Sequence, residues 1–203
     1  TSIDATETLN QHLSTFIEYW YQQQSEHNPQ HLLIEFDEQW PSPCYLYEAQ
    51  QSDQTSGSQR VKWQPVKQTT QDMFCRLSDA LDAVIHPDII TYYTSYYSNN
   101  IQASSADGDL ELLQVWNPQD MERLRSNLIG HALDKKKRRQ PLSFFFAITT
   151  PDEGMLCLDN NSGEIWYEIP GKKPVRKIAN SMSEFILSLQ PNLAPDDWSR
   201  ISP

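Results

Sequence analysis

Few side chains in this 203-residue sequence have the types and spacing that catalysis requires. Cys44 is the best candidate nucleophile, working with a histidine distant in sequence, because a thiol attacks only after a base removes its proton. His86 and Asp88 could form a histidine–carboxylate pair, although a turn that caps itself would use the same two residues. The GxSxG, P-loop and GxGxxG patterns are absent. We therefore expect a protein that is not an enzyme, and keep a hydrolase using Cys44 or His86 as an alternative hypothesis.

The sequence predicts neither a metal site nor a cofactor. His27 and His31 have helical i, i+4 spacing, but Pro29 lies between them and would interrupt such a helix. The three cysteines are odd in number and widely spaced, which argues against a disulfide framework and fits a reducing compartment such as the cytosol. The longest apolar run, 144–148, is far shorter than the ~20 residues of a transmembrane helix. Any membrane role would therefore be peripheral.

The helices that would carry these residues are predicted from apolar spacing and capping residues. A stripe at i, i+4, i+7, i+8 and i+11 indicates a long N-terminal helix with Leu9, Leu13, Phe16, Ile17 and Trp20 on its buried face. A second helix is expected after Asp72, with an apolar face made of Phe74, Leu77, Leu81 and Val84. Asn117 and Pro118 are typical of the first residues of a third helix, and Ser181 opens a capping box for a fourth.

Strands are predicted between these helices. They cover 44–47, 61–64, 109–116, 144–148, 155–158 and 165–169, with a hairpin turn at 160–163. The aromatic segment 88–97 fits a helix or a strand equally well, and 50–59 reads as a polar loop. Because helices and strands alternate without a regular βαβ rhythm, we expect one α+β domain whose mostly antiparallel sheet is flanked by helices. This domain would span 1–191, and 192–203 would be a polar C-terminal tail.

The acidic residues are unevenly distributed. The net charge is −11, yet residues 1–59 hold nine acids and 77–122 hold eight, with no Lys or Arg in either stretch. Such a charge disfavours nucleic-acid binding, which needs a surplus of cations to neutralise phosphates. The acids could be a solvated surface that aids solubility, or they could line a concave face for a cationic partner.

Five basic residues stand together at Lys135, Lys136, Lys137, Arg138 and Arg139. Cations at the end of a helix favourably meet its dipole, which would explain the run without a partner. The same residues could contact anionic lipid head groups. A nucleic-acid contact is the third interpretation, and the surrounding negative charge opposes it.

Several short runs form an ordered pattern that is specific when the runs are taken together. They include 41–44 (Pro-Ser-Pro-Cys), 63–65 (Trp-Gln-Pro) and 85–89 (Ile-His-Pro-Asp-Ile). The most specific is 112–116, Leu-Leu-Gln-Val-Trp, which is followed by Asn-Leu-Ile-Gly-His at 127–131. In this order and spacing the runs resemble the Syd family of SecY-interacting proteins, and the resemblance covers roughly residues 8–191. Gly130 falls within the expected third helix, where a glycine lowers helix stability by about 1 kcal/mol relative to alanine. Its missing side chain would let either the sheet pack closely against the helix or a partner approach it.

The resemblance implies a function that composition does not show. The Syd family is similar in fold to the Smi1/Knr4-like superfamily, is cytoplasmic, and associates peripherally with the cytoplasmic side of the inner membrane. Its members bind the SecY subunit of the translocation channel, and an acidic concave groove is thought to meet the basic cytosolic loops of SecY and so regulate or check it. No enzymatic activity or cofactor is implied, and the oligomeric state stays undetermined. The alternative is an immunity-type inhibitor of a basic toxin.

We assign this groove from the acids in the resembling region. The expected partner-binding acids are Asp88, Asp107, Asp109, Glu111, Asp37, Glu38, Asp152 and Glu153. Aromatic anchors are expected at Trp40, Trp116 and Tyr93, because large aromatic residues are enriched among interface hot spots.

Overall fold

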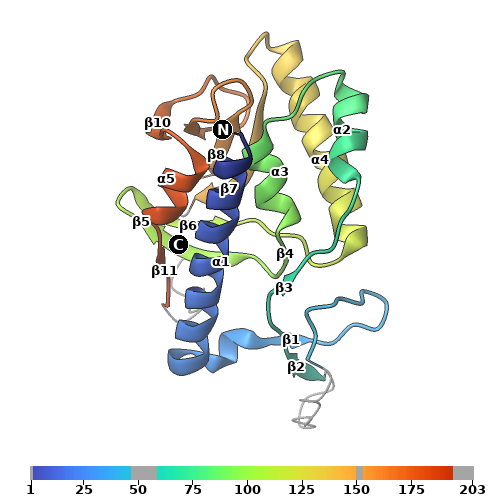
Figure 1. Cartoon of the computed structure of the whole chain (residues 1–203), viewed down its shortest axis with the longest axis vertical. Coiled ribbons are helices and arrows are strands. Elements are labelled where there is room, and N and C mark those ends of the chain that lie inside the picture. The colour runs from blue at the N-terminus through green and yellow to red at the C-terminus, as the bar shows by residue number, and fades with distance from the viewer. Residues whose placement is uncertain (1, 47–58, 150–152, 194–203) are drawn as a thin grey trace.

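A seven-stranded antiparallel sheet forms the centre of the molecule (Figure 1). The computed structural model describes residues 2–46, 59–149 and 153–193. The strand order is β10-β9-β8-β7-β6-β5-β11. The strands are β5 (Ile101–Ser105), β6 (Gly108–Leu112), β7 (Ser143–Thr149), β8 (Met155–Asp159), β9 (Ile165–Glu168), β10 (Arg176–Ala179) and β11 (Gln190–Pro191). With its helices the sheet makes the α+β fold that the sequence predicts.

The strands predicted in the last third of the chain are confirmed as β7, β8 and β9. The hairpin turn at 160–163 is also confirmed, and Gly163 has a φ of 75°, which favours glycine. The strand predicted at 109–116 is shorter than expected, because β6 ends at Leu112. Residues 113–116 run on toward the next helix outside the strand, although the Leu113 N–H still donates to β7, to the carbonyl of Phe146 at 2.9 Å.

Helices α1 (Ser2–His27) and α5 (Met182–Leu187) pack against one another on one side of the sheet. The stripe from Leu9 to Trp20 is buried, as predicted, and the Trp20 indole donates to the carbonyl of Gln102 on β5 at 3.1 Å. Phe185 of α5 packs edge-on against Phe146 of β7. This side of the sheet therefore holds the main apolar core.

Helix α4 (Pro118–Lys137) crosses the other face of the sheet and is itself flanked by α2 (Met73–Leu81). Asn117 caps α4 by accepting the N–H of Asp120 at 2.7 Å, as its position before Pro118 predicts. The α2 prediction is wrong at one residue: Val84 is 86% exposed. Helix α2 ends at Leu81, where Asp82 takes a left-handed conformation, so Val84 is no longer on the buried face.

The aromatic segment that fits helix or strand contains one of each: α3 (Pro87–Thr94) and the short strand β4 (Tyr96–Tyr97). The hydroxyl of Tyr93 on α3 donates to the carbonyl of Phe145 at 2.7 Å. Two small antiparallel pairs complete the fold, β1 (Leu33–Glu35) with β2 (Arg60–Lys62) and β3 (Val66–Lys67) with β4. A short 3-10 helix, η1 (Pro29–Leu32), connects α1 to β1.

Two strand predictions in the first third need correction. At 44–47 the described part of the chain has only an isolated bridge between Tyr45 and Trp63, and at 61–64 the strand ends at Lys62. The predicted loop at 50–59 lies almost wholly outside the described residues. Within the described ranges, no helix combines the length and the apolar character needed to cross a membrane.

Candidate functional site

A cleft of about 400 Å³ lies between the N-terminal half of α4 and the segment around β1. We call it the acidic cleft. Its walls come from segments far apart in sequence: β1 and the loop after it, residues 98–100, residues 113–116, and the first turns of α4. The lining residues used below are Glu35, Asp37, Trp40, Tyr93, Leu113, Trp116, Asp120, Arg123, Asn127 and Phe145.

Two hydrogen bonds fasten the loop after β1 to the segment before α4. The Ser42 hydroxyl donates to the carbonyl of Trp116 at 2.6 Å, and the Asn117 side-chain amide donates to the carbonyl of Pro41 at 2.9 Å. The Tyr45 ring meets the Trp116 ring edge-on, with centroids 5.3 Å apart. Because these contacts are buried or half-buried, they hold one wall of the acidic cleft in a fixed position.

The first two turns of α4 also line the cleft. Asp120 accepts the backbone N–H of Trp116 at 2.8 Å and pairs with Arg123 at 2.7 Å. The Arg123 guanidinium lies over the Trp40 ring, 5.5 Å from its centroid, so a cation–π contact spans the cleft. Trp40 is partly exposed, whereas Trp116 and Tyr93 are buried. Of the three expected anchors, all line the cleft and Trp40 is the most accessible.

Negative charge dominates the acidic cleft. Three carboxylates, Glu35, Asp37 and Asp120, line it together with one cation, Arg123. Two of the expected acids, Glu111 and Asp109, lie on β6 and are not among the residues that line this cleft. Asp109 instead lines a separate pocket together with Asp107 and Arg176. Asp109 accepts a hydrogen bond from Ser104 at 2.7 Å and stays exposed.

The other expected acids lie elsewhere. Glu38 is exposed beside Asp37, but it is not among the lining residues. Asp107 is in the turn between β5 and β6, paired with Arg176 at 2.7 Å, and Glu153 is exposed just before β8. Asp152 lies outside the described residues.

Asp88 begins α3 and lies apart from the acidic cleft. Its backbone N–H donates to His86 Nδ1 at 3.1 Å, so this pair forms the self-capping turn rather than a catalytic dyad. Burial raises the pKa of Asp88, and the charge of His86 opposes the shift. Gly163 approaches the same imidazole closely, which packs His86 against the β8–β9 turn.

The structure removes one residue from the expected lipid-contacting run. Lys135 is 4% exposed, and its amino group bonds to the carboxylate of Glu168, which is 1% exposed. The remaining members, Lys136 to Arg139, are exposed. Lys135 turns inward because it lies on the sheet-facing side of α4, opposite β9.

The candidate nucleophile is poorly placed for chemistry. Cys44 is fully buried, and burial raises its pKa to about 11, so the thiol stays protonated at neutral pH. Burial likewise raises the pKa of Cys157 well above its ordinary value. Among the described residues, no group of three or more His, Cys, Asp and Glu side chains could hold a metal ion.

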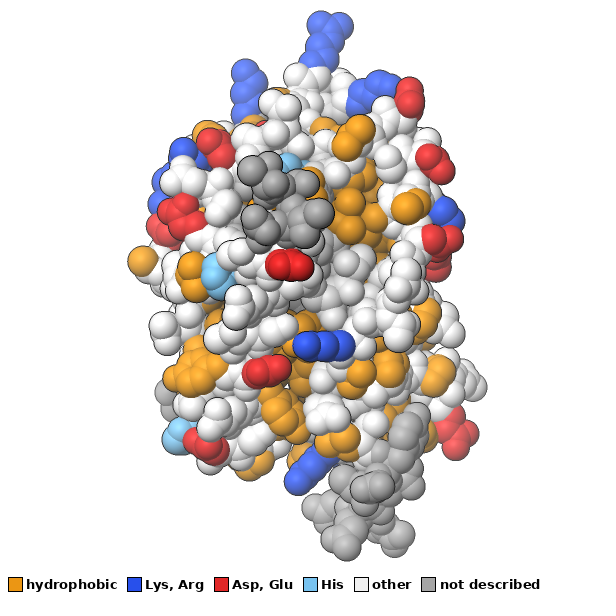
Figure 2. All heavy atoms as spheres, viewed as in Figure 1, with side chains coloured by type: hydrophobic (Ala, Val, Ile, Leu, Met, Phe, Trp, Pro, Cys, Tyr) orange, Lys and Arg blue, Asp and Glu red, His pale blue; other side chains and the backbone are white. Residues whose placement is uncertain are grey.

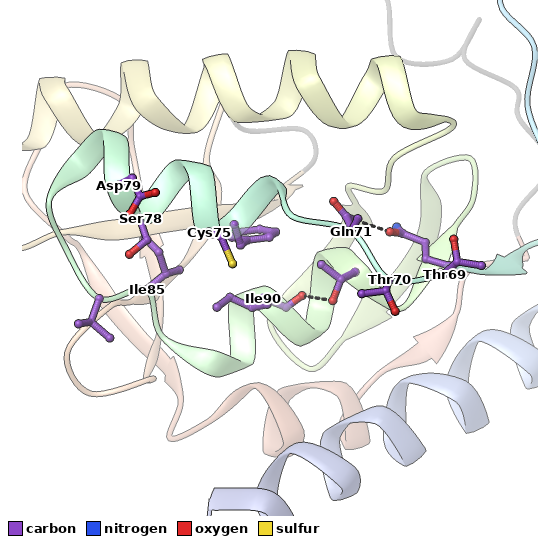
Figure 3. A pocket seen from close by; sticks show the side chains of 12 residues that line it. Thr69, Thr70, Gln71, Cys75, Ser78, Asp79, Ile85 and Ile90 are labelled. Atoms are coloured by element: carbon purple, nitrogen blue, oxygen red, sulfur yellow. Dashed lines mark hydrogen bonds between the residues drawn. The ribbon is translucent and has the colours of Figure 1, made fainter.

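A larger groove of about 660 Å³ runs between α2 and α3, shown in Figure 3. Its lining is mostly apolar or carries hydroxyl and amide groups, with Asp79 as the one acid among the lining residues. Cys75 points from α2 toward Ile90 across the groove, and the Thr94 hydroxyl is already bonded to the Ile90 carbonyl at 2.6 Å. This groove is concave but has only one charged residue in its lining, so the acidic cleft is the better candidate for recognising a charged partner.

Two cleft acids, Glu35 and Asp120, are missing from the sequence-based assignment. Glu35 could have been found from the alternation Ile-Glu-Phe-Asp in 34–37, which places Glu35 and Asp37 on one face of an extended chain. Asp120 stands three residues after the cap Asn117, a position at which a carboxylate commonly meets free N–H groups. Neither signal shows which other segments close the cleft.

The comparisons agree on one family. The profile described as "Syd protein (SUKH-2)" matches residues 10–191. "Protein Syd" of Pseudoalteromonas atlantica is 37% identical over 186 residues, covering 92% of this chain and 97% of that protein. "Protein Syd" of Colwellia psychrerythraea is 39% identical over 191 residues, covering 90% and 92%. That of Alteromonas mediterranea is 41% identical over 160 residues, covering 79% and 85%. This chain therefore belongs to the Syd family.

Proposed function

We propose that this protein is a non-enzymatic binding protein that engages SecY at the cytoplasmic side of the inner membrane and regulates or checks it. The acidic cleft would receive a basic cytosolic loop of SecY. The observation that carries the proposal is the meeting of Glu35, Asp37 and Trp40 at the edge of one cleft, with the carboxylates exposed and the indole accessible. Opposite charges would steer the loop into the cleft, and the indole would anchor it.

The cleft also offers a path for an extended chain. Arg123, Asn127 and Gly130 lie at i, i+4 and i+7 on the exposed face of α4, and the first two line the cleft. A Cβ added at Gly130 would meet no atom within 4 Å, so close packing against the sheet does not explain this glycine. Open space beside Gly130 supports the other interpretation, in which a partner's backbone passes along α4.

Charge reversal in the cleft tests the proposal. We expect Glu35→Lys/Asp37→Lys to weaken binding to purified SecY in detergent at least about tenfold at low salt, since two attractive contacts become repulsive. The matched control is Glu7→Lys/Glu18→Lys, which changes the net charge equally at exposed positions on α1. Binding of the wild-type protein should also fall steeply with salt, because exposed charges are screened beyond ~8 Å at physiological ionic strength.

Two results would contradict this assignment. Equal losses in the cleft variant and the α1 variant would mean that net charge, and not the cleft, governs binding. Unchanged SecY binding by the cleft variant would place the SecY site elsewhere. Capture of a basic toxin in place of SecY, lost in the cleft variant, would keep the cleft and replace the partner.

A further inference from the structure

Positive charge gathers at one end of the molecule. The last residues of α4 and the two residues after it are basic, and the loop between β9 and β10 carries two lysines. We call this set the basic end; it consists of Lys136, Lys137, Arg138, Arg139, Lys172 and Lys173, all exposed. In Figure 2 blue side chains project from the top of the molecule, where α4 ends in Figure 1.

The two parts of the basic end are held together. The Arg138 guanidinium donates to the carbonyl of Gly171 at 2.9 Å, which ties the end of α4 to the β9–β10 loop. Arg139 and Lys173 line the same pocket of about 420 Å³. The fold thus merges two basic runs that are more than thirty residues apart in sequence into a single surface.

Most cations of the basic end have no ionic partner among the described residues. Arg138 pairs with Asp134 at 2.9 Å, whereas no ion pair within the described ranges involves the other five members. Three acids line the pocket that Arg139 and Lys173 share. Glu164 pairs with Lys177, Glu168 pairs with Lys135, and Asp159 accepts the N–H groups of the turn that follows it. The basic end therefore keeps its positive charge in an otherwise acidic protein.

We propose that the basic end binds the surface of a membrane that contains anionic phospholipid. A flat anionic surface can contact the basic end without approaching the acids of the cleft. Helix α4 has 20 residues and is about 30 Å long, so the acids of the cleft at its other end lie several Debye lengths of ~8 Å from the lipid. A nucleic acid that followed the protein surface would meet those acids, since the net charge is −11.

An apolar side chain supports the same occupant. Val175, in the β9–β10 loop beside the two lysines, is 53% exposed. A small apolar group among cations suits the boundary between head groups and acyl chains. Docking by this end would leave the acidic cleft on the part of the molecule away from the lipid, open to loops that project from the membrane. The proposal goes beyond the SecY assignment and stands without it.

Sedimentation with protein-free vesicles tests this surface. The wild-type protein should sediment with phosphatidylcholine vesicles that contain phosphatidylglycerol, and less of it should sediment at high salt. With vesicles of pure phosphatidylcholine the protein should stay in the supernatant. Each basic residue near an anionic surface raises the partition coefficient of a protein onto vesicles about fivefold. Lys136→Glu/Lys137→Glu should therefore lower this partition coefficient at least about 30-fold. The matched control, Lys62→Glu/Lys67→Glu, changes the net charge equally at exposed positions on β2 and β3 and should bind as the wild type does.

Three outcomes would overturn the proposal. The first is vesicle binding by the Lys136→Glu/Lys137→Glu variant at the wild-type level, and the second is an equal loss in both variants. The third is displacement of the wild-type protein from the vesicles by duplex DNA at equal phosphate concentration, which would assign the basic end to nucleic acid. Because the vesicles contain no SecY, these results do not depend on whether the acidic cleft binds that partner.

Discussion

Replacing Lys135 by methionine should destabilise the protein by about 3–5 kcal/mol, because it leaves a buried carboxylate without its countercharge. Lys135 and Glu168 are 4% and 1% exposed. The Lys135 amino group bonds to Glu168 and also lies 3.3 Å from the Gln140 side-chain oxygen. Methionine keeps much of the lysine stem but removes the ammonium group, so Glu168 keeps the Ser143 hydroxyl at 2.8 Å and no cation.

Urea denaturation followed by tryptophan fluorescence measures this cost, since the chain has six tryptophans. In thermal unfolding the same loss lowers Tm by about 6–20 °C for a domain of this size. Lys136→Met is the matched control: the neighbouring lysine is exposed, and its replacement should change stability by no more than about 0.5 kcal/mol.

A double substitution separates the broken pair from lost packing. In Lys135→Met/Glu168→Leu neither charge remains, and apolar replacements of buried ion pairs are often neutral or stabilising. We expect the double variant to recover most of the stability that the single variant loses. The reasoning fails if Lys135→Met unfolds at the same urea concentration as Lys136→Met, or if the double variant is as unstable as the sum of the two single variants.

Two further predictions concern α4. Gly130→Ala should raise the free energy of unfolding by up to about 1 kcal/mol in urea titrations, since the new Cβ meets no neighbour and alanine favours the helix; a loss of stability would show that the site is packed. Burial lowers the pKa of His131 below its ordinary 6.5, so the folded state resists a proton that the unfolded state accepts. Stability should therefore fall as pH drops below about 6.5, and His131→Gln should reduce that fall when Tm is measured from pH 7 to 5; parallel curves for the two proteins would contradict the assignment.

Local signals in the sequence predicted the helices well. The apolar stripe of α1 and the Asn117 cap of α4 depend on neighbours within a few residues, and both appear as expected. Val84 was misplaced because α2 ends at Leu81, before the left-handed Asp82, whereas the apolar spacing continues past the end of the helix. A periodic pattern alone does not show where a left-handed residue stops a helix.

Strands with weak patterns were missed. β5 and β10 were not predicted, because their alternation is partial and their pairing partners are decided by the whole sheet. Strand β6 ends at Leu112 although the apolar pattern continues to Trp116, since Val115 and Trp116 are buried against other segments and not within the sheet.

The residues of the candidate site, too, could be predicted from the sequence only in part. Of the residues that the sequence suggested for partner binding, Asp37, Trp40, Trp116 and Tyr93 line one cleft. The sequence also suggested Asp88 for this site, although Asp88 belongs to the capping turn at the N-terminal end of α3, whereas Tyr93 lies near its C-terminal end. Which acids share a surface depends on contacts such as that between Ser42 and Trp116, 74 residues apart.

The sequence by itself determined the family, the fold class, the main helices and the uneven charge, because these follow from residue order and from spacing within single elements. Only the tertiary structure decided which charges face solvent together. Lys135 and Lys136 are adjacent and chemically identical, yet one is buried against Glu168 and the other is exposed at the basic end. Burial and pairing of a charge depend on segments that meet only after folding, and so do the acidic cleft and the basic end.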